Sequence, residues 1–215
     1  MREEQMMEKK TYSCVSRTKH SFETALAELS KTTPLQKITV KALCERAQLS
    51  RNAFYFHYAD IDALIEDIEN NMYAAITDLL EEVKQIGFPE CVNVTVRRLP
   101  DLFIRHRDIT MMLINSPYSS EFIGKIDKLF GDFFFQYFSA YHNTKFRVGY
   151  DYFYAFLSSG FYGLLNRYLQ DPDAMPRERF TALAYTLVKR LITLDGPKGN
   201  TPRAGMEPDA EKKPR

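Results

Sequence analysis

The stretch ITVKALCERAQLSRNAFYFHY, residues 38–58, decides how this chain folds. Four apolar residues in its first half follow the i, i+3, i+4, i+7 spacing of one buried helical face. They are Val40, Leu43, Cys44 and Ala47. A second short helix is predicted over residues 51–57, because the two residues between the helices leave room only for a tight turn.

Each of the two predicted helices follows a residue suited to cap it. Thr39 precedes the first helix and Ser50 precedes the second. Hydroxyl oxygens at such positions accept hydrogen bonds from backbone N–H groups of the first turn. On the second helix Phe54 can face inward, whereas Arg51 and Tyr55 cannot both be buried with it. A short exposed helix of this kind is what the major groove of DNA admits.

The order of residues here also resembles the N-terminal domain of TetR/AcrR-type transcriptional regulators. The similarity begins at Ile38-Thr39-Val40, continues through Ala47-x-Leu49-Ser50-Arg51-x-x-Phe54-Tyr55-x-His57-Tyr58 and ends at Leu64. It covers roughly residues 17–70, about a quarter of the chain. The order Ser-Arg-x-x-Phe-Tyr-x-His at this distance from Ile-Thr-Val is fairly specific. The remaining three quarters resemble the family only in length and helical character.

The resemblance implies a set of DNA-contacting residues. Arg51 is expected at a base edge, since arginine pairs with guanine through two hydrogen bonds. Tyr55 and His57 match positions that touch the phosphate backbone. The full set is Thr39, Lys41, Ser50, Arg51, Asn52, Ala53, Tyr55 and His57. The alternative is a solvated, charged helix pair in some other helical bundle.

Three positions depart from the family pattern. Gln48 stands at a turn position usually filled by glycine, where a left-handed backbone costs roughly 1 kcal/mol. Ala53 replaces a threonine and so lacks one hydroxyl. Ile61 stands where a lysine often grips the DNA backbone; Arg17 and Lys19 are candidates to substitute for it. These departures predict weaker phosphate contacts.

Charge is distributed unevenly along the chain of 215 residues, although its formal net charge is only +1. Residues 1–58 hold ten Lys and Arg against six Asp and Glu, a net charge of +4. Residues 59–90 hold one Lys against nine acids, a net charge of −8. The basic excess therefore coincides with the segment predicted to meet phosphates.

Several functional classes find no support in the sequence. The four histidines and three cysteines show no metal-binding spacing, so we expect no cofactor and no metal. Phosphate-binding loops and nucleophile elbows are missing, so we do not expect an enzyme. The longest uncharged stretch of the C-terminal half, residues 152–166, is too short to span a bilayer. Dispersed cysteines and a charged N-terminus indicate a cytoplasmic protein without membrane association.

The remaining periodicity predicts an all-α fold of about nine helices. We expect a flexible N-terminal arm (residues 1–15), a helix-turn-helix DNA-binding domain (16–60), a helical effector-binding and dimerisation domain (61–195) and a disordered tail (196–215). The tail has four Pro and three Gly in twenty positions. Pro100 falls inside a predicted helix and is expected to kink or interrupt it.

The C-terminal segments suggest a dimer interface and a ligand pocket. Small residues at i, i+4, i+8 let a second helix approach closely, and in the resembled family the last two helices pair across a two-fold axis. The predicted interface comprises Ala155, Phe156, Ser159, Gly160, Gly163, Leu164, Leu183, Leu187 and Leu191. An apolar effector pocket is predicted from Phe103, Met111, Met112, Phe122, Phe130, Phe134 and Tyr137. Packing within one monomer is the alternative for both sets.

These features favour a DNA-binding transcriptional regulator. The expected form is a homodimeric repressor that binds two-fold related half-sites of double-stranded DNA and is released by an apolar small molecule. The alternative is a ligand-independent regulator of the same type that acts as a co-activator through a protein partner.

Overall fold

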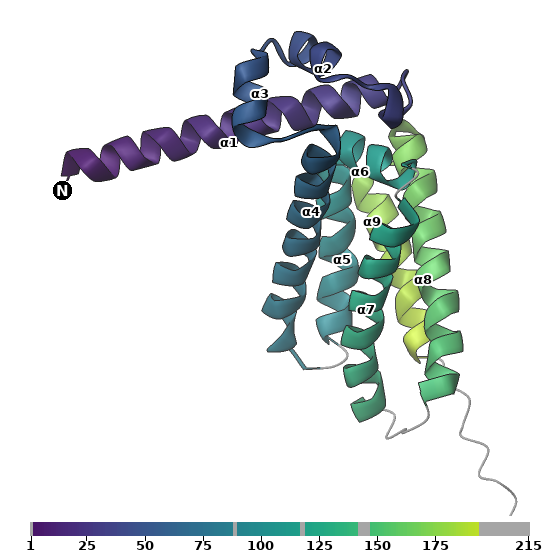
Figure 1. The fold of residues 1–215 in the computed structure, drawn as a ribbon. Coiled ribbons are helices and arrows are strands. Elements are labelled where there is room, and N and C mark those ends of the chain that lie inside the picture. Colours follow the sequence, from purple (N-terminus) through teal and green to yellow (C-terminus); the bar gives the residue numbers. More distant parts are fainter. Residues whose placement is uncertain (1, 88–89, 117–118, 142–146, 194–215) are drawn as a thin grey trace, which may run out of the picture.

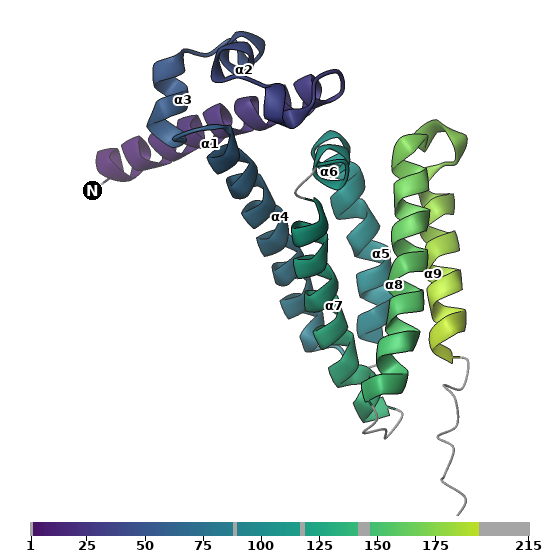
Figure 2. The same cartoon turned by 45° about the vertical axis from the view of Figure 1, so that its right-hand side comes forward.

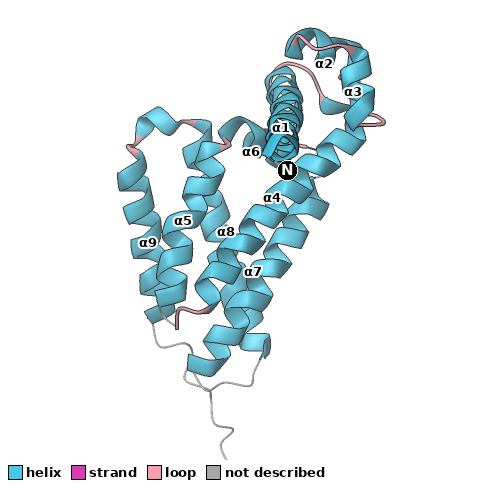
Figure 3. Ribbon diagram, turned by 90° about the vertical axis from the view of Figure 1, so that its left-hand side faces the viewer, coloured by secondary structure: helices cyan, strands magenta, loops and turns pink. Residues whose placement is uncertain are grey.

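The computed structural model describes residues 2–87, 90–116, 119–141 and 147–193, with side chains described for 16–87, 90–116, 120–136 and 150–192. Over these ranges the chain forms nine α-helices and two short 3-10 turns, with no β-strand among them (Figure 3). The predicted all-α fold of about nine helices is confirmed. The predicted disordered tail, residues 196–215, lies outside the described residues.

The helices fall into a small N-terminal group and a larger bundle (Figure 1). The first group comprises α1 (Arg2–Ser30), α2 (Val40–Ala47) and α3 (Arg51–His57), with a 3-10 turn η1 (Leu35–Lys37) between α1 and α2. The bundle comprises α4 (Ile61–Lys84), α5 (Glu90–Arg105), α6 (Arg107–Ile114), α7 (Ser119–Tyr141), α8 (Arg147–Gln170) and α9 (Arg177–Thr193), with a turn η2 (Pro172–Ala174) before α9.

Helix α4 joins the two groups. Its N-terminus lies beneath α1 and α3, and it then runs down the bundle beside α5 and α7 (Figures 1 and 2). Eight apolar side chains of α4 are buried, and they are those that its sequence periodicity indicates: Leu64, Ile65, Ile68, Met72, Ile76, Leu79, Leu80 and Val83. One helix therefore belongs to the core of both groups.

The predicted caps and turn of the helix-turn-helix are present. The Thr39 hydroxyl accepts a hydrogen bond from the Ala42 N–H at 3.2 Å, and the Ser50 hydroxyl accepts one from the Ala53 N–H at 3.1 Å. Gln48 adopts the left-handed conformation, with φ 56° and ψ 37°. This residue closes α2, since its N–H bonds back to the last turn of that helix.

Two segments differ from their sequence-based expectations. Helix α1 begins at Arg2, so residues 2–15 continue a helix where the sequence predicts an arm. This segment contains no Gly or Pro and is rich in Glu, Gln, Met and Lys, which favour helices. Pro100 does not interrupt α5, which is continuous from Glu90 to Arg105. The burial of Pro100 beside Val96 and Leu99 offsets the loss of one backbone hydrogen bond.

None of the helices that the structure describes combines the length and the apolar character needed to cross a membrane.

We predict that Gln48→Gly raises the free energy of unfolding by up to about 1 kcal/mol, because glycine adopts the left-handed region without Cβ strain. Urea denaturation measures the change. Gln85→Gly is the matched control, since Gln85 also closes a helix but has φ −76°. The control should be neutral or destabilising. Equal effects of the two substitutions would contradict strain at Gln48.

Candidate nucleic-acid interface and ligand cavity

Helix α3 is held by a single buried side chain. Phe54 is fully buried, with 0% exposure, and is the only residue of the seven in α3 to be buried. Its ring meets Phe22 of α1 edge to face at 5.3 Å and lies 5.7 Å from the ring of Tyr58. Because Phe54 is the only fully buried side chain of α3, four of the other side chains of the short helix, Arg51, Asn52, Tyr55 and Phe56, remain exposed to solvent.

The exposed face of α3 carries most of the predicted DNA contacts. Arg51, Asn52 and Tyr55 are all exposed. Lys41 on α2 is exposed as well, and its ammonium lies 3.9 Å from Glu45. Thr39 and Ser50 stand exposed at the N-termini of α2 and α3, where backbone N–H groups and the helix dipole favour a phosphate. The structure thus brings these six predicted residues to the outside of one helix pair.

The remaining two predicted residues are half-buried. Ala53 packs against the core of the small domain. His57 lies near Lys19 and Asp67, and its pKa is lowered from 6.5, first by burial and then by the Lys19 charge. The imidazole is therefore neutral at pH 7 and can offer a phosphate only a neutral N–H.

Phe56 is a candidate that the sequence-based set omits. Its side chain is 78% exposed, more than that of Tyr55 at 57%, and its ring stacks edge to face against His57. An exposed phenylalanine on a groove-sized helix can contact thymine methyl groups. The sequence could have indicated this residue. If Phe54 faces inward on a helix, the side chain two positions later faces outward.

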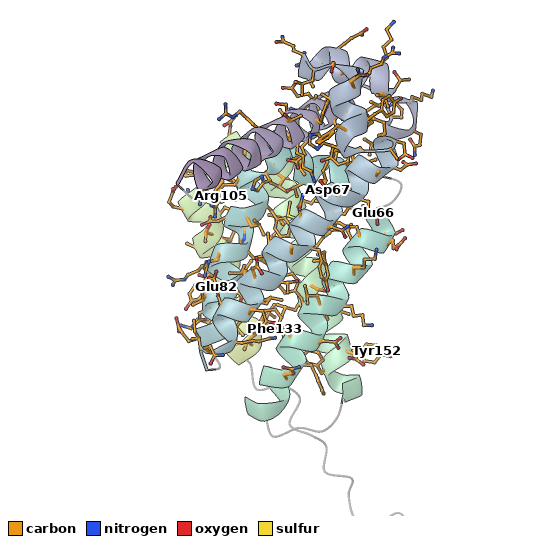
Figure 4. All side chains as sticks on the ribbon, turned by 60° about the vertical axis from the view of Figure 1, so that its left-hand side comes forward. Glu66, Asp67, Glu82, Arg105, Phe133 and Tyr152 are labelled. Carbon is orange, nitrogen blue, oxygen red and sulfur yellow. The ribbon has the colours of Figure 1, made fainter. Side chains whose placement is uncertain are left out.

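A polar contact fixes this module to α4. The Asp67 carboxylate accepts hydrogen bonds from the Lys19 ammonium of α1 at 2.9 Å and from the Tyr58 hydroxyl after α3 at 2.8 Å. Lys19 also lies over the Tyr58 ring, 5.4 Å from its centre. Asp67 lies on the upper part of α4, close to the small domain (Figure 4). Lys19, which the sequence offered as a substitute phosphate contact, is engaged in this interaction instead.

The ionisation of these groups follows from the same contacts. Burial acts to raise the pKa of Asp67, but hydrogen bonds from Lys19 and Tyr58 outweigh it and leave the pKa below 3.8. Burial, followed by the hydrogen bond to Asp67, raises the pKa of Tyr58. The stability that Asp67 contributes is therefore complete above its ordinary pKa and is lost as the pH falls through the lowered value.

Helix α6 makes a second connection between the two groups of helices. The Lys31 ammonium at the end of α1 contacts the Asp108 carboxylate at 2.8 Å. The neighbouring Arg107 donates a hydrogen bond from Nε to the Leu169 carbonyl of α8 at 2.7 Å. Two adjacent residues of α6 thus link the N-terminal group of helices to the last turn of α8.

A cavity of about 550 Å³, open to solvent on one side, lies among α5, α7, α8 and α9. This volume lies within the range of small-molecule sites. Three of the predicted pocket residues line it, namely Phe103, Phe130 and Phe134. At Gly131 the α8 helix comes close to α7, since a Cβ there would lie 3.2 Å from the Tyr154 ring.

Three other predicted pocket residues lie elsewhere. Met112 is buried in the main core, and Met111 packs against a separate cluster around Leu169. Phe122 lines a groove between α4 and α7. The side chain of Tyr137 lies outside the described residues. Residue type indicated an aromatic pocket, but it could not show which side of α7 each ring occupies.

The predicted dimer residues divide between two locations. Phe156, Gly160 and Gly163 are exposed on α8, and Leu183 and Leu187 are exposed on α9. Tyr152 extends this face at the other end of α8 and projects away from the bundle (Figure 4). Ala155 and Ser159 are exposed but also line the cavity, Leu164 packs within the monomer, and Leu191 is half-buried.

Across the described residues, no group of three or more His, Cys, Asp or Glu side chains is placed to hold a metal ion. No protein-family model matches this sequence, and no curated protein matches it either.

Solved structures do resemble this one. The fatty acid degradation regulator FadR from Bacillus halodurans superposes with a TM-score of 0.61 at 10% identity, over 82% of this chain and 95% of that one. A candidate transcriptional regulator from Pseudomonas aeruginosa PAO1 superposes with a TM-score of 0.56 at 16% identity, over 81% and 89% of the two chains. A TetR transcriptional regulator from Rhodococcus sp. RHA1 gives 0.49 at 13% identity, over 83% and 98%.

The first two superpositions establish the fold over more than four fifths of the chain. The chain shares the all-helical fold of these two solved structures, as the all-α expectation from the sequence implies.

We predict that Asp67→Ala lowers the free energy of unfolding by about 1–3 kcal/mol, because the buried Tyr58 hydroxyl loses its acceptor and Lys19 loses its ion pair. Chemical denaturation followed by circular dichroism measures the change. Asp78→Ala, an exposed position on the same helix, is the control and should stay within about 0.5 kcal/mol of the parent. A loss at position 67 no larger than at position 78 would contradict the role of this contact.

Proposed function

We propose that this chain is a homodimeric, DNA-binding transcriptional repressor that a small molecule releases from its operator. The observation that carries the proposal is the outer face of α3, where Arg51, Asn52, Tyr55 and Phe56 are exposed together on a helix of seven residues. A helix of this size enters the major groove. The fold that the chain shares with solved regulators supports the same function.

The chemistry of this face suits DNA in two ways. Arg51 and Asn52 offer hydrogen bonds to base edges, and Phe56 offers an apolar contact to thymine. Thr39, Lys41 and Ser50 stand where they would meet phosphates, which position a protein without reading sequence. The face therefore combines groups for specificity with groups for affinity.

The exposed face of α8 and α9 supports a dimer. Phe156 is 68% exposed, and Leu183 and Leu187 are each 39% exposed. In the monomer, a Cβ added to Gly160 or Gly163 would meet nothing within 4 Å. A flat strip of small residues flanked by exposed apolar side chains is suited to close packing against a second helix pair. Two copies would then present two α3 helices to two half-sites.

Regulation would pass through α4 and α6. The cavity lies within the bundle, and the bundle holds the DNA-facing module through Asp67 of α4 and Asp108 of α6. A ligand that favours one placement of these helices would change the distance between the two α3 helices. The coupling would be reciprocal, so that DNA and ligand each weaken binding of the other.

The alternative function is a ligand-independent co-activator that depends on a protein partner. The small number of side chains free to contact DNA phosphates supports this alternative. Ile61 packs partly against the core at the position where the resembled family often has a lysine, and Lys19 is paired with Asp67. Such a regulator would bind its DNA weakly alone. A salt-dependent gel shift on the promoter of its own gene separates the two functions, because only the repressor binds tightly without a partner.

We also propose that the protein acts in the cytoplasm, where its DNA would be. Cys44 and Cys91 are free and buried, and burial raises the pKa of both thiols. Such thiols stay protonated and unreactive.

Arg51→Ala should weaken binding to the best operator by about 1–3 kcal/mol while leaving binding to random DNA nearly unchanged, since the lost contact is to a base. Fluorescence anisotropy with both DNAs measures this difference. Arg98→Ala removes the same charge from α5, far from α3, and should affect neither DNA. If Arg51→Ala weakens both DNAs equally, Arg51 contacts only phosphate.

Gly163→Leu should convert the dimer to monomers, because a leucine side chain would separate helices that pack closely across the two-fold axis. Analytical ultracentrifugation measures the molecular mass. Gly87→Leu is the control, since position 87 is equally open in the monomer but lies after α4, away from this face. A parent that is monomeric at micromolar concentration would contradict the dimer.

A further inference from the structure

The walls of the cavity are aromatic. Among its described lining residues are eight Phe and Tyr side chains, contributed by α5, α7 and α8. Two pairs are stacked within the lining: Phe130 with Phe134 at 6.0 Å, and Tyr150 with Tyr154 at 5.8 Å. The π faces of such rings carry partial negative charge and attract cations.

The charge in the lining is negative. Among acidic and basic residues the described lining holds Asp127 alone, which is exposed, and no described lysine, arginine or histidine accompanies it. The lysines of α7 at positions 125 and 128 line the groove on the α4 side instead. Helix α7 therefore presents its cations to one side and a carboxylate to the cavity.

Tyr154 adds a hydrogen-bond acceptor to this lining. Its hydroxyl donates a hydrogen bond to the Asp127 carbonyl at 2.9 Å, which directs the O–H away from any ligand and leaves oxygen lone pairs available. Burial, followed by the Asp127 charge, raises the pKa of Tyr154. The phenol remains neutral and can serve as an acceptor.

The chemistry of the lining discriminates between ligand classes. An anionic ligand would lose its hydration and find no cation among the described lining residues, which is costly in an apolar site. A cation with an apolar body would gain ring faces on two helices and a carboxylate within the same lining. A neutral apolar molecule would gain only the apolar contacts.

We propose that this cavity binds a hydrophobic aromatic cation. The proposal rests on the proposed function for its regulatory meaning, since the cation would be the effector that releases DNA. The preference for a cationic ligand concerns the cavity alone and can be tested without DNA.

Tetraphenylphosphonium and tetraphenylborate make the sharpest pair of probes, because they have nearly the same shape and opposite charge. Isothermal titration calorimetry of the full chain with each ion compares their affinities. The phosphonium ion should bind at least about tenfold more tightly, as the ring faces and Asp127 both favour it. Equal affinity, preference for the borate ion, or no binding of either ion at millimolar concentration would overturn the proposal.

Two variants assign the preference to the cavity. Asp127→Asn should weaken phosphonium binding by about fivefold, the size of one solvent-screened ion pair, and should not weaken borate binding. Phe134→Ala should weaken phosphonium binding about tenfold. Asp78→Asn makes the same change of charge on α4, outside the lining, and should leave both affinities unchanged. An equal loss in Asp78→Asn and Asp127→Asn would overturn the assignment to this cavity.

A DNA-binding measurement distinguishes failure of this inference from failure of the proposed function. Anisotropy with operator DNA is recorded with and without saturating phosphonium, which should weaken DNA binding at least about tenfold. A chain that prefers the phosphonium ion but never binds DNA would overturn the proposed regulator and support the cavity chemistry. A chain that binds DNA but prefers the borate ion would support the regulator and overturn the cation site.

Discussion

The packing of Phe54 against Phe22 is the contact on which the position of α3 depends. Helix α3 has only seven residues, and Phe54 alone is buried, against Phe22 of α1. A helix this short does not persist by itself in water, so its position is set by this ring and by the Ser50 cap. With Phe54 turned inward, Arg51, Asn52, Tyr55 and Phe56 are exposed together, which is what the proposed contact with DNA requires.

The same module is joined to the bundle by one continuous apolar core, which runs through α4, and by a few specific polar contacts. Asp67 joins α4 to Lys19 and Tyr58, and Asp108 joins α6 to Lys31. Helix α4 shares its buried face with both groups. A ligand in the cavity that shifted α4 or α6 would act on α3 through Tyr58 and α1, which is the physical basis for the proposed release of DNA.

Local patterns in the sequence were sufficient for the fold but not for the sites. The caps Thr39 and Ser50, the left-handed Gln48 and the buried stripe of α4 follow from spacing and residue type alone. Which side of α7 a ring occupies depends on the placement of α4 and α8, so the sequence could not show that Phe122 lies in the groove between α4 and α7, apart from Phe130 and Phe134. The engagement of Lys19 by Asp67 joins residues 48 positions apart, and no local pattern reveals it.

The central claim is that paired α3 helices read DNA in the major groove. Hydroxyl-radical footprinting of the full chain on the DNA upstream of its own gene, with excess random DNA present, tests it most directly. The account predicts two protected patches, related by two-fold symmetry and separated by about one helical turn or a multiple of it. Complete absence of sequence-specific protection by the folded, dimeric protein would contradict it.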